Sequence, residues 1–236
     1  MNALFRACHQ DICHSDLSKS RRQLQVTVKS VRLDSRNNIS GDFDFFCVVC
    51  NSSKDMANDF LVSKWKIWYK SLDVNHDGKI SKEDVEESRS KFTELHHLEA
   101  DKKKQVEENF EKWWLEYIFR NRTGEISESE FVEALNKDFK ADKKQFVKQM
   151  QNCFDTMFAV IDTNQDRSIS EEEFLIAFKA YGHENVALDT KFFKAYNPDA
   201  NGLVPMKDIV ASWVDFTSSE DSSKPSVVKT AFESGV

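Results

Sequence analysis

The sequence predicts a compact all-α protein built from four helix-loop-helix units in two packed pairs, with short β pairings between neighbouring loops. Apolar residues recur at helical spacing through almost every segment after about residue 56, and strand signals are almost absent. Four short segments rich in Asp, Asn and Gly interrupt this pattern. These loops are residues 73–84, 119–130, 162–173 and 197–208. We therefore expect one pair of units over 56–138, a second over 139–217, and a tail over 218–236 that packs on the body.

Residues 1–55 differ in composition from the rest of the chain. They carry eight Lys plus Arg against six Asp plus Glu, a formal charge of +2 within a chain of 236 residues and net charge −7. Four of the five cysteines also lie there, the segment is rich in serine, and its helical periodicity is poor. The stretch "MANDF" at Met56 resembles a natural start. We expect 1–55 to be a disordered or spurious extension outside the functional domain.

Each loop lies between two amphipathic helices. The first is preceded by Phe60, Leu61, Trp65, Trp68 and Leu72 and followed by Val85 and Phe92. The second is preceded by Val106, Phe110, Trp113, Trp114 and Ile118 and followed by Phe131 and Leu135. The third is preceded by Phe146, Met150, Phe154, Phe158 and Ile161 and followed by Phe174, Leu175 and Phe178. The fourth is preceded by Ala187, Phe192, Phe193 and Tyr196 and followed by Ile209 and Trp213.

The first loop, "DVNHDGKISKED", has the spacing of a site for a hard cation. Calcium and magnesium prefer oxygen, and a twelve-residue loop offers it at positions 1, 3, 5, 7, 9 and 12. Those positions are filled by Asp73, Asn75, Asp77, Lys79 through its carbonyl, Ser81 and Asp84. Gly78 supplies the bend at position 6, and Ile80 is placed to pair with the neighbouring loop. The alternative is a solvated acidic turn, for which this spacing of oxygen-bearing residues would be a coincidence.

The third loop, "DTNQDRSISEEE", has the same pattern and ends in a glutamate. Its oxygen donors are Asp162, Asn164, Asp166, Ser168 through its carbonyl, Ser170 and Glu173. Arg167 replaces glycine at position 6 and must accept strain of roughly 1 kcal/mol in the left-handed region. Anchoring of the ion by both oxygens of Glu173 can outweigh that strain, so we predict a second ion site here.

The second and fourth loops are weaker candidates. In the second, Phe119 occupies position 1 and cannot coordinate an ion, so a structural role is favoured there. The fourth offers Asn197, Asp199, Asn201 and Asp208, with Pro205 at position 9. Two carboxylates instead of three predict weak binding or none. Tight sites are therefore predicted only in the first and third loops.

This pattern resembles the EF-hand proteins known as sarcoplasmic calcium-binding proteins of invertebrates, most of all the bivalve mollusc members. The resemblance is carried by "LVSKWKIWYKSLDVNHDGKIS", "DTNQDRSIS", "AYGHEN" and "TAFESGV", and it runs from about residue 56 to residue 236. It implies a compact protein of the muscle cytoplasm, or sarcoplasm. Such a protein binds calcium and magnesium and has no known enzymatic activity. Residues 1–55 are not covered by it.

Composition narrows the function classes. The acidic balance disfavours nucleic acid and anionic membrane, no apolar run could span a bilayer, and the N-terminus lacks a secretory signal. We expect a monomeric buffer of calcium that requires no protein partner, with magnesium competing at the first loop. A calcium sensor of the calexcitin type is the alternative, but only three methionines, Met150, Met157 and Met206, lie beyond Met56 to line a target groove. A coelenterazine-binding photoprotein is a remote third, and we expect no enzyme.

Overall fold

The computed structural model describes residues 27–33, 39–46 and 57–236 and divides the chain into two units, Met1–Asn51 and Ser52–Val236. In the first unit, strand β1 (Thr27–Leu33) pairs antiparallel with β2 (Ile39–Phe46), and Val28 lies opposite Phe45. No strand is predicted here from helical spacing or loop motifs, although "FDFF" alternates apolar and acidic residues with the period of a strand. The rest of the predicted extension over 1–55 lies outside the described residues.

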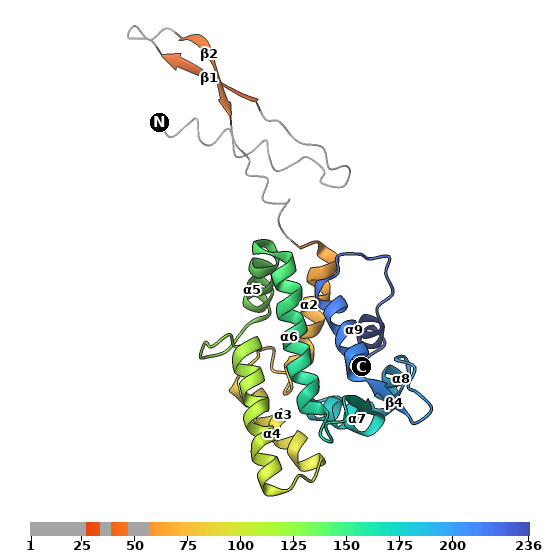
Figure 1. The fold of residues 1–236 in the computed structure, drawn as a ribbon. Helices are drawn as coiled ribbons and strands as arrows, with labels where there is room; N and C mark the ends of the chain where they lie inside the picture. The colour runs from red at the N-terminus through yellow and green to blue at the C-terminus, as the bar shows by residue number, and fades with distance from the viewer. Residues whose placement is uncertain (1–26, 34–38, 47–56) are drawn as a thin grey trace. The chain divides into compact units, whose positions relative to one another are not determined.

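Residues 57–236 form a helical body with two short strand pairings (Figure 1). The first half contains α2 (Asp59–Leu72), α3 (Lys82–Leu95), α4 (Ala100–Trp113), the π-helical turn η2 (Trp114–Ile118) and α5 (Glu128–Ala141). The second half contains α6 (Lys143–Ile161), β3 (Ser168–Ser170), α7 (Glu171–Ala180), α8 (Val186–Lys194), β4 (Leu203–Pro205) and α9 (Met206–Ser218). Helix α10 (Val227–Glu233) follows in the tail. The predicted all-α fold is confirmed.

Helix starts depend on the residue at position 9 of each loop. Ser81, Ser127 and Ser170 each cap the following helix, and in each case the acid three residues later bonds back to the cap. Helix α9 begins instead after Pro205, which makes no side-chain cap. Three of the four loops therefore end in a reciprocal cap, and the fourth does not.

The predicted pairings between neighbouring loops are confirmed. In the first half, Ile80 and Ile126 exchange backbone hydrogen bonds of 3.0 and 2.8 Å. In the second half, β3 and β4 pair antiparallel, with Ile169 opposite Val204. Each loop thus shares its centre with one neighbour, as strand pairing requires.

The core joins the two halves through α6, which packs against α4, α5, α7 and α9. The ring of Phe154 on α6 lies 5.4 Å from that of Trp68 on α2 and 5.3 Å from that of Trp213 on α9. Trp65 also contacts Phe146 on α6, with 5.9 Å between ring centroids. Because rings from the two halves contact the same residues of α6, the apolar faces of the halves are buried against each other.

The tail packs on both halves of the body. Helix α10 packs against α8, α9 and α2, and its Phe232 ring lies 6.0 Å from Trp213 and 6.2 Å from Phe192. At the other end, Asn58 donates from its backbone and side chain to Glu220, at 3.1 and 2.8 Å. In the parts of the chain that the structure describes, no helix combines the length and apolar character that a bilayer crossing requires.

Candidate metal sites

The loop 73–84 folds around the side chain at its first position. The two carboxylate oxygens of Asp73 accept hydrogen bonds from the backbone N–H groups of Asp77, at 3.1 Å, and Gly78, at 2.9 Å. Asn75 also accepts from Asp77, at 3.0 Å, and Asp77 accepts from the N–H of Lys79, at 2.9 Å. The oxygens at positions 1 and 3 therefore share the N–H of Asp77 as a donor.

The loop 162–173 repeats this pattern. Asp162 accepts from the N–H groups of Asp166, at 3.2 Å, and Arg167, at 2.9 Å. Asn164 accepts from Asp166 at 3.0 Å, and Asp166 accepts from Ser168 at 2.8 Å. The two loops therefore present the same donor set by the same internal hydrogen bonds.

Both loops hold the acid at position 12 in a buried position. The side chain of Asp84 is fully buried; one oxygen accepts from the N–H of Val74, at 2.8 Å, and the other from the N–H and hydroxyl of Ser81, at 2.7 and 3.1 Å. Glu173 is bound in the same way by Thr163, at 3.0 Å, and by the N–H and hydroxyl of Ser170, at 3.0 and 2.8 Å. Each acid thus closes its loop between the second and ninth positions.

The bend of each loop requires left-handed backbone. Gly78 has φ +89°, and Arg167 at the corresponding position has φ +65°. His76 and Gln165, two residues earlier, also have positive φ, at +58° and +62°. The arginine therefore adopts the strained conformation that the sequence predicted, at a cost of roughly 1 kcal/mol relative to an unstrained residue.

The second loop offers no comparable donor set. Phe119 at its first position is buried in the core beside Trp114, with ring centroids 6.3 Å apart. Arg120, at the second position, forms an ion pair of 2.7 Å with Asp138 on α5. Glu130 caps α5 through Ser127 and is exposed. Residues 119–130 therefore form a largely exposed turn that carries Ile126 to the first loop.

The fourth loop is only partly organised. Asp199 accepts from the N–H groups of Asn201 and Leu203, at 2.8 and 3.0 Å, and these bonds hold its pKa below the usual range. Among the described residues, the side chains of Asn197 and Asp208 have no hydrogen-bond partner, and Asp208 is exposed. The first and twelfth positions, which close the other two loops, are therefore open here.

Two contacts to the first loop are not predicted by the loop spacing. The hydroxyl of Tyr69 on α2 lies 3.0 Å from the carbonyl of Gly78 and 2.8 Å from that of Ile126, and burial raises its pKa to about 12. Lys79, predicted to serve through its carbonyl, also pairs its ammonium with Glu125 at 2.7 Å. Both contacts connect the first loop to the second. The only sequence signal for Tyr69 was its place one turn before the loop.

The chemistry of the two closed loops fits a hard cation. Among the described residues, no three His, Cys, Asp or Glu side chains converge as a preformed cage. Instead, acids, amides and backbone carbonyls supply an all-oxygen set, which suits Ca²⁺ or Mg²⁺. Burial raises the pKa of Asp73, N–H donors from Gly78 and Asp77 oppose that rise, and the nearby carboxylate of Asp84 adds to it. A cation between those two carboxylates would relieve their repulsion.

Comparison with known proteins places the chain in a family. A family model described as EF hand matches residues 70–87, which span the first loop. A sarcoplasmic calcium-binding protein of Mizuhopecten yessoensis is 53% identical over 176 residues, which are 75% of this chain and 99% of the relative.

Two solved structures share the fold at lower identity. The coelenterazine-binding protein of Renilla muelleri has a TM-score of 0.58 at 21% identity, covering 73% of this chain and 94% of its own. A sarcoplasmic calcium-binding protein of amphioxus has a TM-score of 0.50 at 19% identity, covering 74% and 96%. On the identity and coverage of the Mizuhopecten yessoensis relative, the chain belongs to the sarcoplasmic calcium-binding proteins.

Proposed function

We propose that this chain binds and buffers calcium in the cytoplasm of muscle, the sarcoplasm, through the loops 73–84 and 162–173. It acts as a monomer, requires no protein partner and catalyses no reaction. The observation that carries the proposal is the closure of both loops by a buried acid at position 12, Asp84 or Glu173. In this proposal, the last carboxylate joins the oxygens at positions 1, 3 and 5 around the ion.

Magnesium competes with calcium at the first loop in this proposal. Calcium accepts six to eight oxygens in flexible geometry, whereas magnesium demands a near-octahedral set of six. Asp84 is one methylene shorter than Glu173 and more readily offers a single oxygen to an ion. The first loop therefore suits magnesium better than the third, where a glutamate supports higher coordination.

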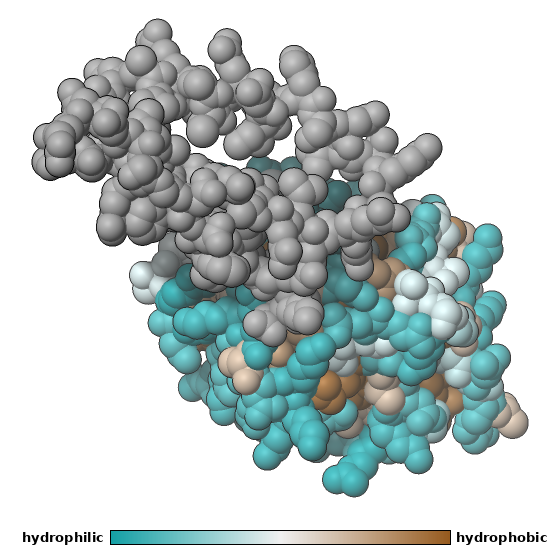
Figure 2. Space-filling model, turned by 90° about the horizontal axis from the view of Figure 1, so that it is seen from above, coloured by the Kyte–Doolittle hydropathy of each residue, from teal (hydrophilic) through white to brown (hydrophobic). Residues whose placement is uncertain are grey.

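A calcium sensor is the main alternative, and it needs an apolar surface for its target. The large apolar residues exposed in the described part of the chain are Leu115, Val147 and Val186. On the face seen in Figure 2, hydrophilic residues predominate and the apolar spots are scattered. The rings that could form a target groove, such as Trp68 and Trp213, are instead packed on Phe154. These features favour a buffer.

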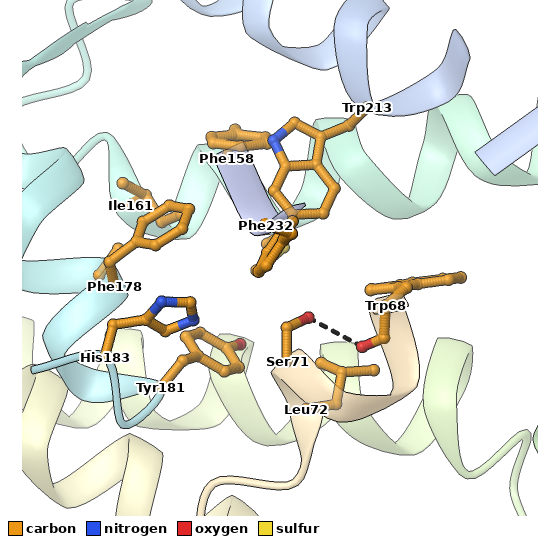
Figure 3. A pocket seen from close by; sticks show the side chains of 12 residues that line it. Trp68, Ser71, Leu72, Phe158, Ile161, Phe178, Tyr181, His183, Trp213 and Phe232 are labelled. Atoms are coloured by element: carbon orange, nitrogen blue, oxygen red, sulfur yellow. Dashed lines mark hydrogen bonds between the residues drawn. The ribbon is translucent and has the colours of Figure 1, made fainter. Parts of the chain in front are cut away.

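A ligand in the core is disfavoured by the available volume. A cavity of about 30 Å³ lies among residues from α2, α6, α7, the turn after α7, α9 and α10, including Trp68, Tyr181, His183, Trp213 and Phe232 (Figure 3). Pockets for drug-sized ligands have volumes of roughly 300–1,000 Å³. This one has room for about one water molecule. A coelenterazine-sized ligand would require Phe232 and its neighbours to move out.

Calcium titration calorimetry with and without millimolar magnesium tests the proposal. We expect two tight calcium sites in the parent, and magnesium should weaken the apparent affinity of one more than the other. Replacing both Asp73 and Asp162 by alanine should abolish tight binding, whereas Asn197→Ala should leave it intact. Tight binding retained in the double variant would refute the assignment of the loops.

A hydrophobic dye separates the buffer from the sensor. Because the apolar faces of the two halves already cover each other, calcium should leave dye fluorescence nearly unchanged. A large calcium-dependent rise, or calcium-dependent capture of a target helix, would favour the sensor instead.

A further inference from the structure

A groove of about 1090 Å³ lies beside the loop 73–84. Residues of α2, α3 and this loop line it, together with the segment 181–185 after α7, α8 and the tail. The loop and the segment meet where Gly182 approaches Val74, since a Cβ at Gly182 would be 2.9 Å from the Val74 carbonyl oxygen. Pockets of roughly 300–1,000 Å³ hold small organic ligands, so the groove is large enough for one.

The groove differs from the small cavity in the core, although the two share part of their lining. Tyr181, His183 and Phe232, which surround the core cavity in Figure 3, also line the groove. Asp189 on α8 lines the groove and not the cavity. A ligand in the groove therefore contacts a carboxylate that the core cavity lacks.

Asp189 is a buried acid with an unpartnered oxygen. The residue is 1% exposed, and among the described residues its Oδ1 has no hydrogen-bond partner. Buried carboxylates are normally paired or hydrogen-bonded, because their desolvation costs free energy. The other buried acids in the described part of the chain follow this rule by accepting from backbone N–H groups: Asp73, Asp84, Asp162 and Glu173. Asp189 therefore lacks a partner that a ligand in the groove can supply.

His183 does not supply the missing partner. Its Nδ1 lies 3.8 Å from Oδ1 of Asp189, which is too far for a hydrogen bond. Burial lowers the pKa of His183 to about 4, so at pH 7 the ring is neutral and one of its nitrogens is an acceptor. Burial raises the pKa of Asp189 to about 6, so at pH 7 its carboxylate is mostly ionised. An anion and a neutral acceptor thus lie next to each other.

The charges of the groove favour a cation. Lys91 is already paired with Glu87 at 2.6 Å. The other charged side chains of the lining are one ammonium and three carboxylates: Lys70, Asp73, Glu184 and Asp189. This balance is negative and attracts positive charge.

An organic cation fits the groove better than a metal ion. Among the described residues, no three His, Cys, Asp or Glu side chains come together as a metal site. Because Asp189 is almost enclosed, only a narrow head group can reach it, and an ammonium is more compact than a guanidinium. Apolar surface lies next to the acceptors, since the rings of His183 and Phe232 are 5.8 Å apart.

We propose that this groove binds a small organic amine, whose primary ammonium donates to Asp189 and His183 and whose apolar body packs on Phe232. The inference goes beyond calcium buffering and does not require an ion in either loop. A free amine and the side chain of a lysine in a peptide carry the same chemistry. The experiment therefore includes a probe for each source.

Calorimetric titration of the full-length chain tests the proposal. Millimolar calcium is present throughout, so that carboxylates of the ion loops are not free to attract the amine. The probes are phenethylamine, lysine blocked at its α-amine and carboxyl group, and phenethyl alcohol, which has the body of phenethylamine without the charge. We expect one site for at least one of the two ammonium probes, and the tighter of the two identifies the source. Phenethyl alcohol should bind more weakly than phenethylamine.

Variants of the two acceptors locate the ammonium. Asp189→Asn should weaken binding by about tenfold or more, because a hydrogen bond to a charged group is lost. This change removes a buried charge, so the fold should be retained. His183→Phe keeps a ring beside Phe232 but removes the nitrogen, and it should weaken binding by about threefold. Asp208→Asn is the matched control, because it neutralises an exposed acid that does not line the groove.

Three results would overturn the inference. One is the absence of saturable binding by both ammonium probes, and another is equal affinity in the parent and in Asp189→Asn. The third is binding of phenethyl alcohol as tight as that of phenethylamine, because the groove would then recognise the apolar body alone. Calcium titration without any amine is measured separately, so each of these results leaves the proposed calcium sites untouched.

Discussion

Replacing Glu173 by glutamine is expected to remove one calcium site and to destabilise the ion-free protein. In the parent, all four donors around this carboxylate, on Thr163 and Ser170, point at oxygen. A glutamine has one oxygen and one NH₂ group, so in either orientation the backbone N–H of Thr163 or Ser170 faces another donor, whereas the neighbouring hydroxyl can rotate to accept. Leaving such a donor unsatisfied costs about 1–3 kcal/mol.

The size of the effect differs between calcium-free and calcium-loaded protein. Without calcium, a loss of about 2 kcal/mol should lower Tm by roughly 4–8 °C for a body of this size. With free calcium at 100 times Kd, each occupied site contributes about 2.7 kcal/mol, so the calcium-dependent gain should fall from about 5.4 to about 2.7 kcal/mol. The variant should therefore be affected more strongly when calcium is present.

Thermal unfolding in chelator and in calcium, combined with calorimetric stoichiometry, measures both effects. Asp208→Asn is the matched control, because this acid has the same loop position but is exposed and, among the described residues, has no hydrogen-bond partner. It should leave stoichiometry and Tm unchanged. If Glu173→Gln keeps two tight sites, or if Asp208→Asn loses one, then a buried acid at position 12 does not identify the loops that bind calcium tightly.

Three further predictions follow from single features. Asp84→Glu should raise the preference of the first loop for calcium over magnesium, and equal magnesium competition in variant and parent would contradict this. A chain that begins at Met56 should fold and bind calcium like the full chain, because Asn58 is already held by Glu220; loss of affinity on truncation would count against it. Burial raises the pKa of Asp189 to about 6, so the folded state favours its protonated form. The parent should therefore lose stability relative to Asp189→Asn as pH rises from about 4 to 6. A stability difference between the two chains that is constant with pH would rule this out.

Much of the fold and of the donor set could be predicted from local sequence. Helical spacing located the helices, and the positions of Asp73, Asp77, Asp162 and Asp166 follow from the loop spacing alone. The exposed acid at position 12 of the fourth loop can also be explained from the local sequence. Pro205 at position 9 has neither the N–H nor the hydroxyl that Ser81 uses to hold its acid, so Asp84 and Asp208, identical in type, end up buried and exposed.

Other features depend on contacts between distant segments and could not be found this way. The approach of Gly182 to Val74 joins residues more than 100 positions apart, and nothing in either local sequence specifies it. The π-helical turn η2 at Trp114–Ile118 likewise reflects the packing of Trp114 against Phe119 and Tyr181. Patterns of spacing describe which face is apolar, but they do not say which partner covers it.

The aromatic core has an optical consequence. All five tryptophans of the chain are buried, at 0–4% exposure. Their emission should be blue-shifted and poorly accessible to iodide in the native protein, and unfolding should produce a large red shift. Trp68 and Trp213 both contact Phe154 on α6. The emission of tryptophans from the two halves therefore depends on the same aromatic core. Intrinsic fluorescence will therefore report the folding of the whole body, and a probe for one loop alone must be introduced elsewhere.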